Sequence, residues 1–238
     1  MGPLRAALDL ADPRPATGDR EQKKNYAERL SHALATVVAN ALRKDFPGIT
    51  PDADGRRQEA PARTSKGLKK LDVNYSTSEL GLGLGVSIKT INFSDKGSSR
   101  YTKNFTRADN ELRAEAKDYH ERQPYSVLVG VVFLPIEACL DGKTGPSSFG
   151  QAIRIFRHRA GRKNPRNEQE LFERVFVGLY EHEAERRGEI MLLDVMDNPP
   201  KRGVPKSPPG LTFPQFVKEV MKTYDGRNKP TFDWADDD

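Results

Sequence analysis

Residues 125–135, YSVLVGVVFLP, form an almost wholly apolar run, and this run limits the possible folds of the chain more than any other segment. Side chains alternate across a β-strand, so a strand that is apolar at successive positions must bury both of its faces. A strand of this kind lies inside a sheet, with other elements packed above and below it. We therefore predict that residues 125–135 form the centre of a sheet.

The segments around this run have different periodicities. In residues 20–46 the apolar side chains recur at steps of three and four, which predicts an amphipathic helix that ends before Pro47 and Gly48. The other predicted elements are strands over 68–76 and 82–93, a polar helix over 106–122, a Ser-capped helix over 147–162, two strands within 174–196 and a helix over 212–226. The order α-β-β-α-β-α-β-β-α predicts a mixed α/β or α+β fold.

The length of the chain, 238 residues, is enough for one domain with a sizeable core. We expect residues 1–19 to form a weakly ordered arm, residues 20–228 to form the domain, and residues 229–238 to form an acidic tail. The loop over 48–67 mixes proline, glycine and charge, and such a loop either lies along a polyanion or is simply solvated. We favour the solvated loop.

The composition of the chain indicates its cellular compartment and its classes of partner. Cys139 is the only cysteine, so the chain has no internal disulfide and no thiolate zinc cluster, in agreement with a reducing compartment. No apolar run is long enough for a membrane span, and we expect a cytoplasmic protein without a membrane partner. The 39 basic and 34 acidic residues give a net charge of +5, which suits a polyanionic partner but also many ordinary proteins.

Three glycines at alternate positions, Gly81, Gly83 and Gly85, raise the alternative of a phosphate-binding loop. Dinucleotide and Walker-type loops need other spacings and open a helix, whereas Gly85 is followed by the strand-like sequence VSIKTINF. A nucleotide-binding enzyme therefore remains only a third hypothesis. We expect these glycines to allow a bend or the close approach of another backbone.

Asp72, Ser87 and Lys89 form the group with the clearest chemical use. Alternation puts Ser87 and Lys89 on one face of the strand over 82–93, and pairing with the strand over 68–76 brings Asp72 to the same edge. A carboxylate holds a hard cation such as Mg²⁺, while a lysine orients or deprotonates water and stabilises charge on a phosphodiester. A second carboxylate would come from Glu111 or Glu115, which are four residues apart on one face of the following helix.

Asp72, the sequence SIK at 87–89 and the sequence RAEA at 113–116 together resemble the PD-(D/E)xK nuclease superfamily. The resemblance covers residues 68–135 and is closest to type II restriction enzymes in which serine replaces the usual acid and a glutamate of the next helix supplies it. Two departures from that branch are Leu71 in place of proline and a longer connection between the strand and the helix. The resemblance implies a restriction-endonuclease-like central mixed sheet flanked by helices.

It also implies a Mg²⁺-dependent endonuclease, with Mn²⁺ as an alternative metal, that acts on DNA in restriction or prokaryotic anti-phage defence. Asp72 and Glu115 would hold the metal, with Glu111 in reserve, while Lys89 would assist the water beside Ser87. Such a protein would work as a homodimer or within a larger defence complex. The alternative is a non-catalytic nucleic-acid-binding or complex-forming subunit with the same fold.

Basic residues gather in two segments, 100–107 and 154–166. Lysine and arginine contacts to phosphate supply affinity without sequence information. We expect DNA contacts from Arg100, Lys103, Arg107, Arg157, Arg162 and Lys163. The histidines show no paired spacing of metal ligands, and we expect His182 at an exposed strand end. Glu28, in the first helix, is a further candidate acid that the resemblance suggests.

Overall fold

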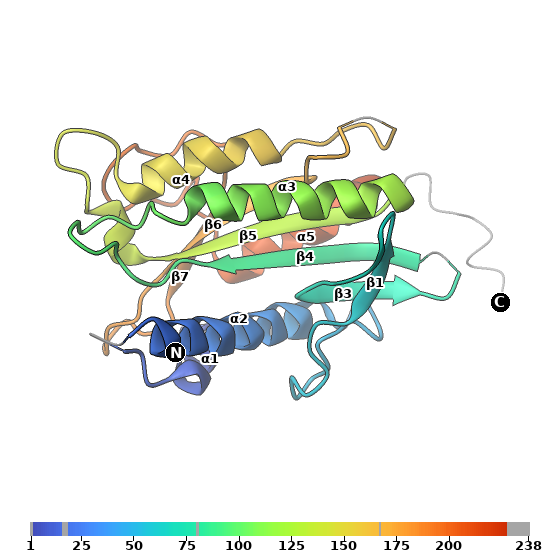
Figure 1. Ribbon diagram of the computed structural model, residues 1–238, viewed down its shortest axis with the longest axis horizontal. Helices are drawn as coiled ribbons and strands as arrows, with labels where there is room; N and C mark the ends of the chain where they lie inside the picture. The colour runs from blue at the N-terminus through green and yellow to red at the C-terminus, as the bar shows by residue number, and fades with distance from the viewer. Residues whose placement is uncertain (1, 16–18, 80, 167, 228–238) are drawn as a thin grey trace.

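A computed structural model describes residues 2–15, 19–79, 81–166 and 168–227. Its centre is a five-stranded sheet with helices on both faces (Figure 1). In spatial order the strands are β3 (Val73–Thr77), β4 (Gly81–Thr90), β5 (Val127–Pro135), β6 (Arg174–Tyr180) and β7 (Ile190–Asp194).

The apolar run chosen from the sequence is β5, the middle strand of this sheet, and each of its residues is buried. It pairs in parallel with β4 and with β6, while the outer strands β3 and β7 are antiparallel to their neighbours. The sheet is therefore mixed, and the predicted mixed α/β fold is confirmed.

Two helical layers cover the sheet. On one face lie α1 (Arg5–Ala11), α2 (Arg20–Leu42) and α5 (Phe213–Arg227), and on the other lie α3 (Phe105–Arg122) and α4 (Ser148–Phe156). Alternation within β5 divides its side chains between two cores. Val129 and Val131 pack with the α2 layer, whereas Leu128 and Val132 pack with the α3 layer.

Residues 1–19 were expected to form a weakly ordered arm, but Arg5–Ala11 of this segment form the helix α1. Leu4, Leu8 and Ala11 are buried in the core beside α2, and this packing stabilises the short helix α1. The Leu4 amide donates to the carbonyl of Gly188, 3.0 Å away in the β6–β7 connection. Arg187 of that connection pairs with two acids of the N-terminal segment, Asp9 and Asp12. The predicted acidic tail, 229–238, lies outside the described residues.

The loop expected over residues 48–67 contains half of a small hairpin. Its strands are β1 (Pro61–Thr64) and β2 (Gly67–Lys70), which pair only with each other. The predicted strand over 68–76 is accordingly interrupted at Leu71 and Asp72. Leu71 packs in the α3 layer and Val73 packs in the α2 layer, so these two side chains lie on opposite faces of the sheet.

The glycine-rich stretch forms β4, which pairs antiparallel with β3 as predicted. A Cβ atom on Gly85 would lie 2.8 Å from a Leu128 methyl carbon and 2.9 Å from a Leu71 methyl carbon. Glycine therefore allows two leucine side chains to pack over the strand backbone. No helix among the described residues is both long and apolar enough to cross a membrane.

Candidate active site

Side chains from β4 and α3 meet above the sheet and form a compact polar group. Ser87 and Lys89 face α3, because the intervening Ile88 points into the opposite core. The Ser87 hydroxyl donates to Glu115 Oε2 at 2.5 Å, and the Lys89 ammonium donates to Glu115 Oε1 at 2.7 Å. One carboxylate of α3 thus bridges the two polar residues of β4.

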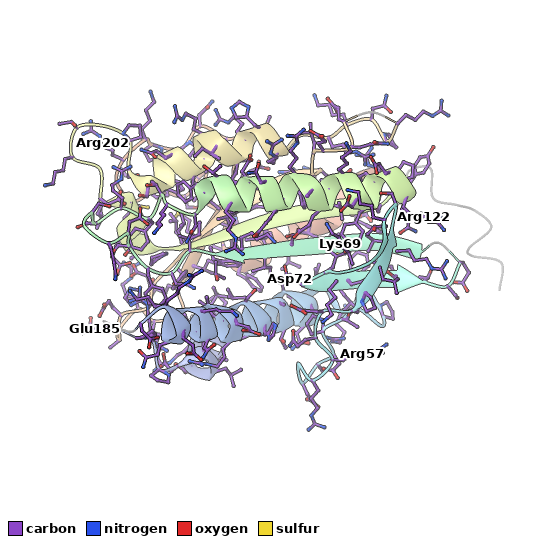
Figure 2. All side chains as sticks on the ribbon, viewed as in Figure 1. Arg57, Lys69, Asp72, Arg122, Glu185 and Arg202 are labelled. Atoms are coloured by element: carbon purple, nitrogen blue, oxygen red, sulfur yellow. The ribbon has the colours of Figure 1, made fainter. Side chains whose placement is uncertain are left out.

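Asp72 lies where the chain passes from the β1–β2 hairpin into β3 (Figure 2). Its Oδ2 atom accepts a hydrogen bond from the Ile88 amide at 2.6 Å. Burial raises the pKa of Asp72 to about 6, although this hydrogen bond and the charge of Lys89 act in the opposite direction. The negative charge of Glu115 raises it further. Burial is therefore the main cause of the raised pKa of Asp72.

Lys89 is only 17 % exposed, yet it keeps its proton. Burial, the largest single effect, lowers the pKa of Lys89, but the charge and hydrogen bond of Glu115 and the charges of Asp72 and Glu111 outweigh it, and the pKa is raised. At neutral pH Lys89 is consequently a cation and a hydrogen-bond donor, not a base.

Glu111 lies at the edge of this group. Its carboxylate is 3.7 Å from the Lys89 ammonium, whereas Glu115 is at 2.7 Å. Its other oxygen accepts from the exposed Arg107 at 2.7 Å, one helical turn away. Of the two glutamates proposed from the sequence, Glu115 makes the closer contacts with the β4 residues.

The structure adds Tyr119, which sequence reasoning missed. Tyr119 is fully buried one turn after Glu115, and its hydroxyl has no hydrogen-bond partner within the described part of the chain. Burial raises the pKa of this phenol, and the charges of Glu115 and Asp72 raise it further. A buried hydroxyl needs a partner, and water bound at the two carboxylates would supply one. The sequence signal that could have identified Tyr119 is its four-residue spacing from Glu115, which puts both residues on one face of the helix.

This donor set fits a hard divalent cation. Asp72 and Glu115 offer carboxylate oxygens, the ligands that Mg²⁺ prefers, and Mg²⁺ keeps several of its waters. The buried carboxylate of Asp72 and the Tyr119 hydroxyl, which has no partner among the described residues, are the two features that favour a hydrated cation here.

The six predicted DNA contacts do not form one surface. Lys103, Arg107 and Lys163 are exposed, whereas the guanidinium of Arg100 binds the carbonyl of Pro146 at 2.9 Å. Arg157 donates to the carbonyl of Val195 at 2.7 Å and to that of Asp197. Arg157 therefore holds the chain after β7 in place.

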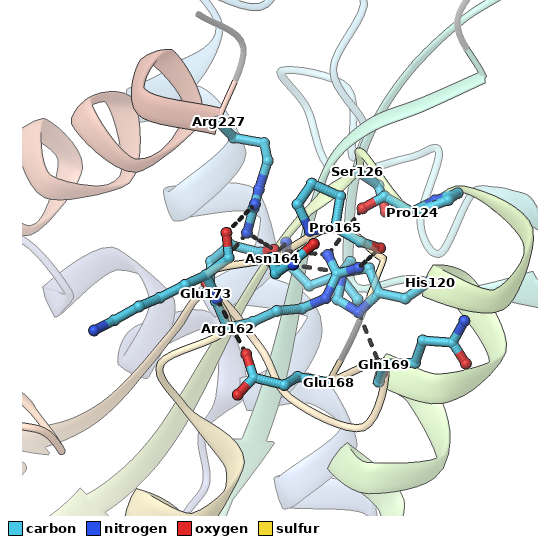
Figure 3. Close-up of polar contacts among 12 residues, drawn as sticks. His120, Pro124, Ser126, Arg162, Asn164, Pro165, Glu168, Gln169, Glu173 and Arg227 are labelled. Carbon is cyan, nitrogen blue, oxygen red and sulfur yellow. Dashed lines mark hydrogen bonds and ion pairs between the residues drawn. The ribbon is translucent and has the colours of Figure 1, made fainter.

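Arg162 is not available to DNA, because its side chain is completely buried. Its Nη1 atom lies 3.0 Å from Glu173 Oε1, and Arg227 Nη2 lies 2.7 Å from the same oxygen (Figure 3). His120 is also buried beside Glu173, at 3.6 Å. The prediction for Arg162 is wrong because a buried carboxylate eleven residues further along the chain, Glu173, neutralises it.

A second acidic group, Glu137, His182 and Glu183, lies elsewhere, and its ligand atoms are within 4.8 Å of one another. His182 was expected at an exposed strand end, but its side chain is 10 % exposed and Nε2 lies 2.6 Å from Glu137 Oε1.

Glu28, the further candidate acid from the sequence, is exposed on α2, and the α2 layer covers the sheet face opposite α3.

The fold and the polar group define a mixed α/β protein with a lysine–carboxylate site. No protein-family model matches the chain, and no curated protein matches it. One solved structure is similar at a low level: SfsA of Pyrococcus furiosus in complex with Ca²⁺, with 15 % sequence identity and a TM-score of 0.30. The match covers 69 % of this chain and 62 % of the SfsA chain.

Proposed function

We propose that this protein is a metal-dependent endonuclease that hydrolyses phosphodiester bonds in DNA. The observation that carries the proposal is the bridge of Glu115 between Ser87 and Lys89. A serine stands two residues before the lysine, and a helix carboxylate contacts both of them. This is the arrangement expected from the resemblance to PD-(D/E)xK nucleases in which the acid has moved to the next helix.

The roles of the residues follow from their charges and contacts. Asp72 and Glu115 would hold Mg²⁺ or Mn²⁺, which supplies an acidified water and stabilises charge on the phosphate when bound. Lys89, which stays protonated, donates a hydrogen bond towards the attacking water and balances the negative charge that develops on the phosphodiester. Ser87 donates to Glu115 and so fixes the orientation of that carboxylate.

We further propose DNA as the substrate and prokaryotic restriction or anti-phage defence as the setting, either as a homodimer or within a larger complex. The net charge of +5 supports a polyanionic substrate. A partner protein that directs cleavage would suit a chain whose described residues form one domain around a single central sheet. We propose that residues 20–228 form one nuclease domain, onto which the helix α1 packs.

Cleavage of supercoiled plasmid tests the proposal. We expect nicked or linear products with Mg²⁺ or Mn²⁺ and none with EDTA, and no products from Asp72→Ala or Lys89→Ala. The matched control is Lys222→Ala, an exposed lysine of α5 on the opposite face of the sheet. Unchanged activity in both site variants would refute the assignment. Binding without cleavage under every metal condition would favour the non-catalytic subunit.

A further inference from the structure

The β1–β2 hairpin and the residues before it carry a dense positive charge. Residues 56–70 contain six basic side chains and one acid, Glu59. The segment ends two residues before Asp72, so the hairpin leads directly into the candidate active site. Figure 2 shows Lys69 close to Asp72, with Arg57 on the same side of the molecule and Arg202 at the far end.

The hairpin has two different faces. Ala62 and Thr64 are buried and face α3, while Arg63 and Leu68 form a directly opposed pair on the outer face. Leu68 is 69 % exposed. No hydrogen bond or ion pair to another described residue engages the Arg63 side chain, which is also exposed. The outer face thus presents a free guanidinium beside an apolar side chain.

The tip of the hairpin is fixed to the helix that carries Glu115. Lys66 and Lys69 lie 2.8 and 2.6 Å from the two oxygens of Asp118, a buried acid three residues after Glu115. The Ser65 amide also donates to the Asp118 carbonyl at 3.0 Å. Two lysines share the Asp118 carboxylate here, and the Ser65 hydroxyl donates to a second acid of α3, Glu121, at 2.7 Å. Anything bound to the hairpin is consequently held in a fixed position relative to the site.

We propose that the outer face of this hairpin lies in a groove of duplex DNA and positions the backbone at Asp72 and Lys89. This inference rests on the proposed nuclease function. A two-stranded β-ribbon fits the major groove, and arginine with an apolar neighbour suits contacts to phosphate, base edges and thymine methyls. Single-strand binding surfaces use aromatic side chains for stacking, and residues 56–70 contain no aromatic residue.

Binding in EDTA separates this inference from catalysis. Fluorescence anisotropy with a labelled duplex should show that Arg63→Gln weakens binding at least about fivefold and lowers the slope of log K against log salt by about one. Leu68→Ser should weaken binding without changing that slope, because it removes no charge. Arg202→Gln is the matched control, an exposed arginine far from the hairpin, and should bind as the unaltered protein does.

The outcomes distinguish the two proposals. If Arg63→Gln binds duplex with unchanged affinity and salt slope, the hairpin is not the DNA-binding face, whereas cleavage by the unaltered protein would still support the nuclease. If binding depends on Arg63 but no metal supports cleavage, the hairpin is the DNA-binding face and the protein is not a metal-dependent nuclease. A protein that binds no duplex at all overturns both. Equal thermal stability of the variants excludes a folding defect, since both side chains are exposed.

Discussion

The Lys89 ammonium and the Glu115 carboxylate lie 2.7 Å apart, although 26 residues separate them in the chain. The contact joins β4 to α3, so the site depends on the packing of that helix over the sheet. Leu112 and Ala116, which flank Glu115 along α3, are fully buried in the core between helix and sheet. A rigid core thus sets the distance between the proposed catalytic groups.

Replacing Lys89 should abolish most catalysis without abolishing DNA binding. Lys89→Ala removes a protonated donor from the point where charge develops, and we expect plasmid cleavage to fall at least about 100-fold. Lys89→Arg keeps the charge but not the shape, and should recover little activity. Anisotropy in EDTA should give nearly unchanged affinity. Full activity in Lys89→Ala would contradict the role given to this residue.

The two glutamates of α3 should differ clearly. Glu115→Gln should lower cleavage at least about 100-fold, because it removes the charge that bridges Ser87 and Lys89 and would hold the metal. Glu111→Gln should change the rate less than about tenfold, since Glu111 is 3.7 Å from Lys89 and 39 % exposed. Initial rates over a range of Mg²⁺ concentrations measure both effects. The reverse ranking would move the second acid to Glu111.

The ionised form of Asp72 should lower the free energy of unfolding at neutral pH. Its pKa is raised from 3.8 to about 6, so the folded state binds a proton more tightly than the unfolded state between these values. Stability from this group is therefore present at low pH and declines as the pH rises towards 6. We expect Asp72→Asn, whose amide oxygen still accepts from Ile88, to raise the free energy of unfolding by up to about 3 kcal/mol above pH 6.

Urea denaturation on both sides of pH 6 checks this expectation, and the gain should shrink at acidic pH. Mg²⁺ should raise the melting temperature of the unaltered protein but not that of Asp72→Asn, because a ligand stabilises only the state that binds it. Glu28→Gln, which alters an exposed acid of α2, is the control and should keep the Mg²⁺ response. An Asp72→Asn variant that responds fully to Mg²⁺ would remove Asp72 from the metal site.

Arg162 should matter for stability, in contrast to its exposed neighbour. Arg162→Met leaves Glu173 buried with one fewer partner, and loss of one side of a buried ion pair costs about 3–5 kcal/mol. We expect a loss of about 3 kcal/mol, at the lower end of this range, because Arg227 still binds the same oxygen of Glu173. Lys163→Met should change the free energy of unfolding by less than about 0.5 kcal/mol. Urea midpoints measure both, and equal values would contradict a structural role for Arg162.

Sequence patterns predicted the fold where one periodicity dominates. The run that forms β5 and the stepped apolar residues of α2 depend on local pattern alone. The helix α1 was missed because it is short and gains its stability from packing of Leu4 and Leu8 rather than from its own sequence. The β1–β2 hairpin was missed because only small side chains, Ala62 and Thr64, face the core.

Alternation along β4 correctly put Ser87 and Lys89 on one face, and helical spacing gave two candidates for the acid. Local spacing contains no information on which glutamate reaches the strand, whereas in the structure Glu115 lies 2.7 Å from the Lys89 ammonium and Glu111 lies 3.7 Å from it. Arg162 shows the same limit. Its burial depends on Glu173 and on Arg227, which lies 65 residues further along the chain.

The N-terminal helix gains part of its anchorage from the far end of the sheet. Arg187 binds Asp9 across 178 residues of sequence, and the Leu4 amide reaches Gly188. The ribosome makes α1 well before Arg187 and Gly188, which leave the exit tunnel only after β6 has been synthesised. The apolar side chains of α1 can pack against α2 early in translation, whereas the contacts to Arg187 and Gly188 that complete its docking belong to the late events of folding.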